Sequence, residues 1–405
     1  MNLKDFFSGP TVSLPRGDFE KANCTFDVFL KKLFRDYIAE AKKIADPDHR
    51  AICETIEQSI PEIGRIANGI VRATKHYLQG YPHQAYLEVR NTLKNAKFDT
   101  LMTEVSSYNP SAPPAPFDSH LEATLHPDMY RIRPGLGLAA AGTLKKKDIF
   151  HVPFEKRHLV SNQRYSIAGL PCLYLGSSTW ICWEELDRPE LNDCIFSKFK
   201  FAEKTKILDF QLPPANAWRF YTYVQARSRS SQQPPQIGEL QARYNEAFVI
   251  SHILYWPLIA ASSIRVDSRV GAFFPQYIVP QLLLQWVTKE RKVDGIRYFS
   301  TRTPTQMNSQ VNINYVFPTR EIKHSGRCST LRRKIHLLTP ELWAMMEMIN
   351  NDPRDLTALP PGTIDNRVGI VEFSESMKYP YRDTKFYVLE KRLTALGDYF
   401  GPVEL

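Results

Sequence analysis

Residues 164–185, RYSIAGLPCLYLGSSTWICWEE, place an arginine, a tyrosine and two adjacent glutamates among apolar residues. Guanidinium groups bind anionic oxygens, aromatic rings stack on ligands, and fixed carboxylates stabilise positive charge. Arg164, Tyr174 and the Glu184–Glu185 pair could therefore form an active site. They could also be structural, with a surface ion pair between Arg164 and a glutamate while Tyr174 fills the core. The residue pattern by itself slightly favours this second interpretation.

The elements that must position these side chains can be predicted from the same stretch. Residues 172–175 have the apolar character of a strand, and the serines and threonine at 177–179 can cap a helix that runs to about residue 186. Neighbouring residues on a helix point about 100° apart, so only one of Glu184 and Glu185 is expected to face inward. Polar groups held on a strand and a helix are positioned rigidly enough for chemistry.

The first hundred residues are predicted to be all-helical. Apolar residues at three- and four-residue steps predict an amphipathic helix over residues 25–44, followed by helical patterns over 50–78 and 83–95. We expect Pro61 and the segment 80–82 to interrupt these helices. The predicted organisation is a helical domain at 1–110, a proline-rich linker at 111–119, a mixed α and β domain at 120–345 and an α/β extension at 346–405 that packs on the domain at 120–345.

The second half of the chain mixes strands and helices. Strands are predicted at 129–133, 172–175, 206–212 and 295–300, and a helix is predicted near 273–287. A closing helix places Phe386, Leu389, Leu393 and Leu396 on one face. The fold class predicted from these elements is α+β.

Composition limits the classes of function. Lysine and arginine outnumber aspartate and glutamate by 52 to 43, which favours anionic partners such as nucleic acid or a phosphate-bearing small molecule. No apolar run approaches the roughly 20 residues of a membrane span. The first residues lack the pattern of a secretory signal, so a reducing, cytoplasmic location is expected, with the six cysteines as buried thiols.

Several other motifs carry little signal. The glycines of Pro134–Gly142 do not have dinucleotide-fingerprint spacing, and the lysines at 145–147 are typical of a solvated face. His151 and His158 have no cysteine or carboxylate at ligand spacing, so no metal site is predicted. A nucleophilic serine elbow is also missing from the sequence.

Five segments in order along the chain resemble the RES domain, a family named for its arginine, glutamate and serine, and a later sixth segment fits its continuation. These segments are Tyr130–Arg133, His151–Phe154, Gln163–Ser178, Cys182–Glu185, Asp294–Thr301 and Asn314–Pro318. The helical N-terminal region resembles the extension of the longer RES proteins.

The resemblance implies a split-sheet fold similar to ADP-ribosyltransferases, and an enzyme that cleaves the nicotinamide–ribose bond of NAD. It implies five site residues, with Arg133 and Glu184 as neighbours that stay in consideration: Arg131, Arg164, Tyr174, Glu185 and Ser300. In this assignment the arginines hold the pyrophosphate, Tyr174 orients the nicotinamide and Glu185 stabilises positive charge on the ribose. Ser300 would hydrogen-bond the ribose or the nicotinamide amide.

The acceptor of the ADP-ribosyl group stays open between water, phosphate and a macromolecule. A toxin role, with an antitoxin or inhibitory protein as partner, follows from the resemblance alone, and a homo-oligomer is a further expectation. The chain departs from the compact toxins at Asn162–Tyr165 and in the long interval between Glu185 and Ser300. A rival hypothesis is a non-catalytic protein whose arginines neutralise nucleic-acid phosphates. We do not expect nucleic-acid binding, because no aromatic residues interleave the basic runs.

Overall fold

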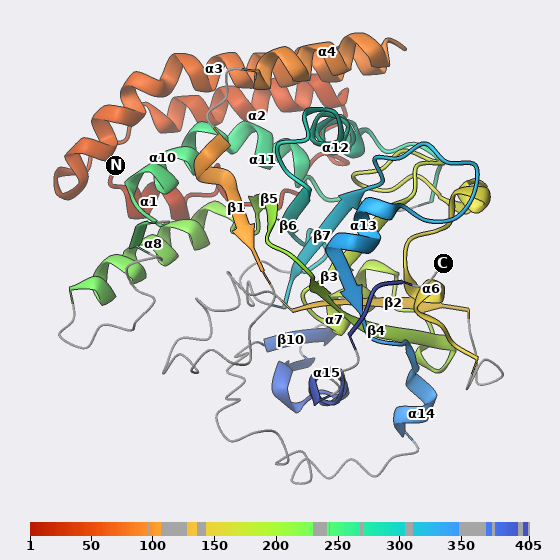
Figure 1. Ribbon diagram of the computed structural model, residues 1–405. Helices are drawn as coiled ribbons and strands as arrows, with labels where there is room; N and C mark the ends of the chain where they lie inside the picture. Colours follow the sequence, from red (N-terminus) through yellow and green to blue (C-terminus); the bar gives the residue numbers. More distant parts are fainter. Residues whose placement is uncertain are drawn as a thin grey trace. The chain divides into compact units, whose positions relative to one another are not determined.

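The fold is described from a computed structural model of the chain (Figure 1). The structure describes residues 1–94, 98–106, 128–135, 143–229, 241–242, 244–267, 270–303, 311–347, 370–374, 377–395 and 400–403. The predicted linker at 111–119 lies outside these ranges. The range 348–369, which precedes the last hairpin and the last helix, also lies outside the described residues.

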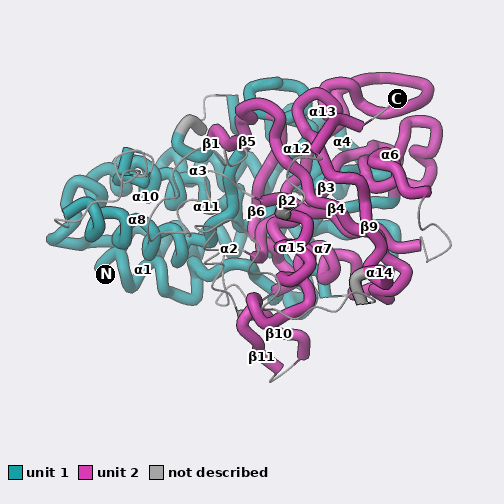
Figure 2. Tube along the Cα trace, turned by 60° about the horizontal axis from the view of Figure 1, so that its bottom comes forward, with its two compact units in different colours: residues 1–103, 161–168, 208–293 teal, residues 104–160, 169–207, 294–405 magenta. Residues whose placement is uncertain are grey.

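The chain forms two compact units (Figure 2). Unit 1 contains residues 1–103, 161–168 and 208–293, and unit 2 contains residues 104–160, 169–207 and 294–405. Unit 1 thus combines the N-terminal helical region with two segments that lie inside the range 120–345 predicted for one catalytic domain.

Unit 1 is helical. Its described helices are α1 (Leu3–Ser8), α2 (Phe26–Ala41), α3 (Arg50–Leu78), α4 (Pro82–Leu93), α8 (Pro214–Ser228), α10 (Glu246–Leu254), α11 (Trp256–Ser262) and α12 (Ile278–Glu290), with 3₁₀ turns at Pro47–His49, Phe98–Leu101 and Pro275–Tyr277. Helices α2, α3 and α4 lie side by side (Figure 1). The expected helices near 25–44, 50–78, 83–95 and 273–287 are confirmed.

Pro61 does not interrupt the second of these helices, contrary to the prediction from the sequence. Helix α3 continues through Pro61 from Arg50 to Leu78. The proline removes one backbone hydrogen bond. Buried isoleucines on both sides of it, including Ile56 and Ile63, hold the two halves against the core and offset that loss.

Aromatic packing joins the N-terminal helices of unit 1 to the later ones. The ring of Tyr37 stacks on Trp256 at a centroid distance of 4.0 Å, and its hydroxyl donates to the carbonyl of Ile253 over 2.7 Å. The Trp256 indole nitrogen donates to the carbonyl of Val12 over 3.0 Å. Residues more than 200 positions apart therefore share one core.

Unit 2 carries most of a nine-stranded sheet. In strand order it reads β1-β5-β6-β7-β3-β2-β4-β8, with β9 also pairing with β4. The strands are β1 (Met102–Val105), β2 (Met129–Pro134), β3 (Cys172–Gly176), β4 (Cys194–Phe201), β5 (Thr205–Phe210), β6 (Gly295–Phe299), β7 (Ile313–Pro318), β8 (Ile335–Leu337) and β9 (Glu341–Leu342). The pairs from β6 to β8 are antiparallel. The predicted α+β class is confirmed.

Short helices and a hairpin complete unit 2. They are α6 (Lys146–Ile149), α7 (Thr179–Glu185), α13 (Ser329–Lys334), α14 (Trp343–Glu347), α15 (Lys385–Ala395), the hairpin β10 (Ile370–Ser374) and β11 (Met377–Pro380), and 3₁₀ turns at Phe154–Leu159, Leu191–Asp193 and Tyr381–Asp383. Helix α15 is the closing helix predicted from Phe386, Leu389 and Leu393, all of which are buried. Leu396 lies outside the described residues.

Strand register divides the side chains of this sheet between two faces. Tyr130 pairs with Gly176, and Gly176 pairs with Asn314, so these three residues share one face. That face packs with the core cluster that also contains Trp180, Ile181 and the apolar residues of α15. The other face carries Leu175 and Tyr315 in a second core cluster. Both faces are buried, as the near-continuous apolar sequence of β7 requires.

Candidate functional site

The turn between β3 and α7 is fixed to the chain around the start of β7. Ser177 donates its backbone N–H to the carbonyl of Ile313 and accepts the N–H of Ile313 on its hydroxyl, at 2.8 and 3.1 Å. The hydroxyl of Ser178 donates to the carbonyl of Val311 over 2.7 Å and accepts the N–H of Ile181 over 3.0 Å. Ser178 is thus the N-cap of α7, as predicted for this turn.

Close packing sets the position of α7 on the sheet. A Cβ atom at Gly176 would lie 2.5 Å from Ile181 Cγ2 and 2.7 Å from Cys182 Sγ, so only glycine fits there. The Cys182 thiol in turn donates to the carbonyl of Tyr130 over 3.2 Å. The helix therefore rests directly on the ends of β2 and β3.

A glutamate from α15 also binds the first residue of α7. Oε1 of Glu390 accepts the backbone N–H of Thr179 at 2.5 Å, the Thr179 hydroxyl at 3.0 Å and the Tyr381 hydroxyl at 2.6 Å. Glu390 is 2% exposed. Charge-assisted hydrogen bonds of this kind are about twice as strong as neutral ones, so the C-terminal segment holds the start of α7 in place.

At the other end of α7, Glu185 is held by residues from two separate segments. Its Oε1 accepts hydrogen bonds from the Ser300 hydroxyl and from Asn314 Nδ2, each at 2.7 Å. The Arg302 guanidinium lies 3.7 Å from the other carboxylate oxygen. Ser300 directly follows β6, and Asn314 is in β7. Strands β6 and β7 therefore position two hydrogen-bond donors on Oε1 of Glu185.

The cluster around Glu185 remains accessible. The Glu185 side chain is 28% exposed, whereas Ser300 is 1% and Asn314 is 4% exposed. Arg302 also forms an ion pair with Asp187 at 2.6 Å and donates its backbone N–H to Ser300 Oγ at 3.1 Å. The arrangement is a partly exposed carboxylate oriented by buried donors, which suits stabilisation of a positive charge on a ligand.

Glu184 has a different environment. Its carboxylate forms a two-point ion pair with Arg188, with both nitrogen–oxygen distances at 3.0 Å. Burial raises the pKa of Glu184, and Arg188 partly opposes that rise. Arg188 also donates to the carbonyl of Phe373. Of the two glutamates, Glu185 is the one that joins Ser300.

The remaining predicted site residues of unit 2 are divided between the two faces of the sheet. Arg131 pairs with Ser197 of β4, which places it on the sheet face opposite Asn314. Arg133 is two residues further along the same face. Tyr174 pairs with Val316, so it is on the face of Asn314 and is partly buried. The structure thus brings Glu185 and Ser300 into contact and places Tyr174 on the same face of the sheet.

Arg164 belongs to unit 1. Its guanidinium donates to the carbonyls of Ser262 and Ile264, at 3.4 and 3.0 Å, and lies over the ring of Tyr277 at 5.2 Å. These contacts tie the segment 161–168 to α11 and the start of α12.

Three polar residues of this region were not given a role by sequence reasoning: Arg302, Asn314 and Glu390. Asn314 begins a segment that carried the family resemblance, but a single asparagine in a buried strand gives no functional signal by itself. Arg302 follows Ser300 by two residues, a spacing that could have marked it. Glu390 lies 211 residues from Thr179, so no local pattern could reveal their contact.

His151 has a structural role. It is fully buried, its Nε2 accepts the N–H of Cys328 at 2.9 Å, and Nδ1 lies 2.8 Å from the carbonyl of Val152, to which it donates. Both ring nitrogens are thus used by the backbone. Burial lowers the pKa of His151 to about 4, with the charges of Arg327 and Arg131 contributing. Neutral imidazole is therefore the form that this core accommodates.

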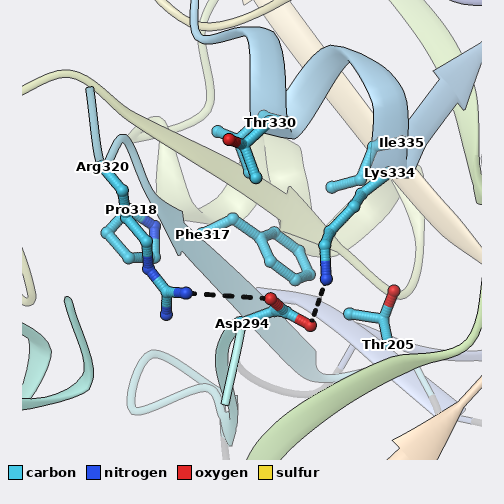
Figure 3. Close-up of a pocket in the computed structure, with 9 residues that line it drawn as sticks. Thr205, Asp294, Phe317, Pro318, Arg320, Thr330, Lys334 and Ile335 are labelled. Atoms are coloured by element: carbon cyan, nitrogen blue, oxygen red, sulfur yellow. Dashed lines mark ion pairs between the residues drawn. The ribbon is translucent and has the colours of Figure 1, made fainter. Parts of the chain in front are cut away.

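A separate pocket lies at the other end of β6 and β7 (Figure 3). Its charged residues form one network, in which Asp294 binds Lys334 at 2.8 Å and Arg320 at 3.8 Å. Asp294 precedes β6, whereas Ser300 follows it, so about 20 Å of extended chain separates this network from the cluster around Glu185. The carboxylate of Asp294 is shared by both cations in this pocket.

Two kinds of feature are missing from the described ranges, a metal-binding cluster and a membrane-spanning helix. They contain no group of three or more histidine, cysteine, aspartate or glutamate side chains placed to hold a metal ion. No helix within them is long and apolar enough to cross a membrane.

Comparisons with known proteins add one relative. No protein-family model matches the chain, and no solved structure matches it. The chain is 31% identical over 339 residues to a Bacillus subtilis (strain 168) protein named "Putative toxin YopC", an alignment that covers 82% of this chain and 69% of that protein. Identity at this level over most of both chains is evidence of common descent, and the chain therefore belongs to the same family as this Bacillus subtilis protein.

Proposed function

We propose that the protein is a toxin that degrades NAD by cleaving its nicotinamide–ribose bond. The observation that carries the proposal is the carboxylate of Glu185, oriented by Ser300 and Asn314 and accessible to a ligand. The RES resemblance of the segments that supply Glu185 and Ser300 supports it. The name of the Bacillus subtilis relative supports the toxin role.

The chemistry fits a single fixed carboxylate. As the bond from the ribose to nicotinamide breaks, positive charge develops on the ribose ring, and nicotinamide leaves as a neutral molecule. A general acid is therefore not required. A carboxylate held by Ser300 and Asn314 pays little reorganisation cost when that charge appears, so it stabilises the transition state more than the ground state.

The donors around Glu185 also distinguish its two carboxylate oxygens, of which Oε2 would face the positive charge of the ribose. Oε1 is occupied by the two neutral donors, while Oε2 lies toward the guanidinium of Arg302. Arg302 also binds Asp187, so its charge is shared between two carboxylates. In this proposal Glu185 lies beside the ribose, and Tyr174 orients the nicotinamide ring. Water or phosphate then attacks the ribosyl carbon from which nicotinamide has departed.

The test is to incubate the purified chain with NAD, with and without inorganic phosphate, and to measure released nicotinamide and the ADP-ribosyl product. ADP-ribose as product identifies water as the acceptor, and a phosphorylated ADP-ribose identifies phosphate. Glu185→Ala is expected to abolish nicotinamide release. Unchanged NAD in both buffers would overturn the proposal, as would equal turnover by the wild type and Glu185→Ala.

An experiment with labelled NAD distinguishes a macromolecular acceptor from water or phosphate. If the label from the adenosine part of NAD becomes attached to an added protein or nucleic acid, the reaction is ADP-ribosyl transfer to a macromolecule. In that case the same bond breaks at the same carboxylate, but NAD degradation is not the function. Label recovered only in small molecules supports the proposal.

A further inference from the structure

Two basic segments of unit 2 lie side by side, although they are far apart in the chain. The first, residues 145–158, contains α6 and most of the 3₁₀ turn that follows it, and the second, residues 321–333, contains most of α13. Four hydrogen bonds of 2.5–2.9 Å join them: Phe154 N–H to the Gly326 carbonyl, Gly326 N–H to Glu155 Oε2, Cys328 N–H to His151 Nε2, and the Arg327 guanidinium to the Lys147 carbonyl. The fold therefore holds the two segments together as one region.

These segments carry most of the net charge of the chain. Together they contain nine lysines and arginines and three acids, a net charge of +6, whereas the whole chain carries +9. Arg320 and Lys334, which flank the second segment, are not counted, because the carboxylate of Asp294 binds both of them (Figure 3). Positive charge gathered in one region attracts an extended anion more strongly than the same charge spread over the molecule.

The three acids of the two segments hold the loops in shape. Each accepts at least one backbone N–H group at 2.8–2.9 Å: Asp148, Glu155 and Glu321. Glu321 also pairs with Lys323 at 2.7 Å. These carboxylates act as counter-charges, since Glu155 and Asp148 oppose the lowering of the pKa of Arg327 by burial. The excess of six positive charges remains after all three acids are included.

Six cationic side chains of these segments are exposed, and we refer to them as the basic surface: Lys145, Lys147, Lys156, Arg157, Lys323 and Arg333. They come from α6 and its N-cap, from the 3₁₀ turn, from the loop before α13 and from α13 itself (Figure 1). The aromatic residues of the two segments, Phe150 and Phe154, are buried. The basic surface thus presents charge without exposed aromatic rings.

The positive region extends beyond the two segments. Burial, and next the charges of Lys200 and Lys146, lower the pKa of His336 in β8. Lys200 is in β4 and Lys146 is in α6, so lysines of two different elements act on one side chain. The electrostatic field is therefore positive at a third element of unit 2 as well.

The chemistry of the basic surface distinguishes between classes of anionic partner. Single-stranded nucleic acids are held by stacking on exposed aromatic rings, which this surface lacks. The centres of protein interfaces are apolar and poor in lysine, whereas Ile322 is the one large apolar side chain that the two segments expose. Attachment to a membrane takes a second signal besides basic residues, such as a lipid chain or the apolar face of a helix. A duplex needs only a rigid positive surface, because lysine and arginine bind its phosphates without aromatic contacts.

The fold changes the interpretation of the basic runs in the sequence. The lack of aromatic residues between them excludes stacking on single strands, but it does not bear on a duplex, whose bases are paired and stacked inside. The lysines at 145–147, taken alone, are typical of a solvated face. In the structure they belong to a larger surface, because a second basic segment is bound beside them.

We propose that the basic surface binds duplex nucleic acid through its phosphates, without reading the base sequence. A duplex carries one negative charge per about 1.7 Å of its axis, so cations from several elements can each reach a phosphate. DNA and RNA duplexes share this chemistry, and their relative affinities tell them apart. Such binding is independent of NAD cleavage and would be an additional activity of unit 2.

The test is the fluorescence anisotropy of labelled DNA and RNA duplexes of about 24 base pairs, titrated with the full-length chain at salt concentrations between about 50 and 200 mM. Wild type is expected to bind with a dissociation constant of about 1–100 µM. The logarithm of the binding constant should fall with the logarithm of salt concentration with a slope of about −3 or steeper. The duplex that binds more tightly identifies the class of nucleic acid.

The variant Lys147→Gln/Lys156→Gln/Arg333→Gln removes one exposed cation from each of three elements: α6, the 3₁₀ turn and α13. None of these side chains forms an ion pair or hydrogen bond within the described residues, so the fold should be unaffected. Circular dichroism and the urea midpoint check this. Duplex affinity at about 50 mM salt is expected to fall about 10-fold or more, and the salt slope should decrease by about 2–3.

The matched control is Arg35→Gln/Arg50→Gln/Arg382→Gln. It makes the same change of net charge outside both segments, at side chains that are 74%, 85% and 72% exposed. It should bind the duplex within about twofold of wild type. The comparison separates the effect of the basic surface from that of the net charge.

The proposal is overturned if folded wild type binds neither duplex at about 50 mM salt, or if the triple variant of the basic surface binds as tightly as its control. Polyglutamate and vesicles of phosphatidylcholine with phosphatidylserine serve as competitors. If either displaces the duplex at an equal concentration of negative charge, the surface suits an acidic protein or an anionic membrane, and the proposal is wrong. These outcomes are separate from those for NAD cleavage, because the binding assay contains no NAD.

Discussion

The hydroxyl of Ser300 donates a hydrogen bond to Oε1 of Glu185 over 2.7 Å and joins two residues that are 115 positions apart in the chain. Asn314 Nδ2 binds the same oxygen at the same distance. Two donors on one oxygen fix the rotation of the carboxylate as well as its position. The other oxygen, Oε2, lies 3.7 Å from the guanidinium of Arg302.

The two adjacent glutamates should respond differently to the same substitution. Glu185→Gln removes the charge that the proposed reaction uses, so nicotinamide release from NAD is expected to fall about 100- to 1,000-fold. Glu184→Gln is the matched control, because Glu184 pairs with Arg188 and does not contact Ser300. Its release rate should stay within about threefold of wild type at saturating NAD. Equal losses in the two variants would contradict the assignment of Glu185.

Substitution of Ser300 tests the positioning of the carboxylate. Ser300→Ala removes one of the two described neutral donors to Oε1 of Glu185, and a lost hydrogen bond to a charged group is expected to lower turnover by about 10- to 100-fold. Ser300→Thr keeps the hydroxyl and should recover part of that loss, although its methyl group must fit a site that is 1% exposed. Steady-state rates of nicotinamide release give the comparison. A threonine variant no better than alanine would mean that packing, and not the hydroxyl, is what matters.

Glu390 should contribute to stability through α7. Glu390→Gln removes the charge that strengthens three hydrogen bonds, and the free energy of unfolding is expected to fall by about 1–3 kcal/mol. Urea denaturation measures the change. Glu104→Gln is the control, since Glu104 is 57% exposed and pairs with Lys204 at the surface. Its cost should be below about 1 kcal/mol, and a similar cost for both variants would refute the special role of Glu390.

The stability of the protein should depend on pH through His151. Its pKa is about 4 in the folded protein and near 6.5 when unfolded, so between these values the unfolded chain binds the proton more readily. Stability is therefore highest above pH 6.5 and falls as the pH decreases toward 4, by at most about 3 kcal/mol. Below pH 4 both states are protonated, and this contribution stays constant.

The measurement is the urea midpoint between pH 7.5 and 4 for wild type and His151→Gln. Glutamine can accept the N–H of Cys328 but does not titrate in this range, so the variant should lose less stability on acidification. The buried His252 also has a lowered pKa, but it is present in both proteins, so the difference between them reports on His151. Parallel pH profiles would contradict this prediction.

Several features followed from the sequence because their physical causes are local. Apolar spacing predicted α2, α12 and α15, and the serines after β3 predicted the cap of α7. The step of about 100° between neighbouring helix residues predicted that only one glutamate of the pair would face inward, and in the structure Glu184 is the more buried of the two. Pro61 was misjudged because the burial of α3 on both sides of it is a tertiary effect.

The contacts that build the site were decided by the tertiary structure. Sequence spacing cannot show that β6 and β7 bring Ser300 and Asn314 to one oxygen of Glu185, or that Glu390 reaches back to Thr179. Strand register placed Arg131 on the opposite face from Asn314, because alternation along a strand becomes a choice of face only when its partners are known. The basic surface likewise exists only in the folded chain, since the charges of its two segments act together only when contacts between residues 171 to 180 positions apart bring them within range.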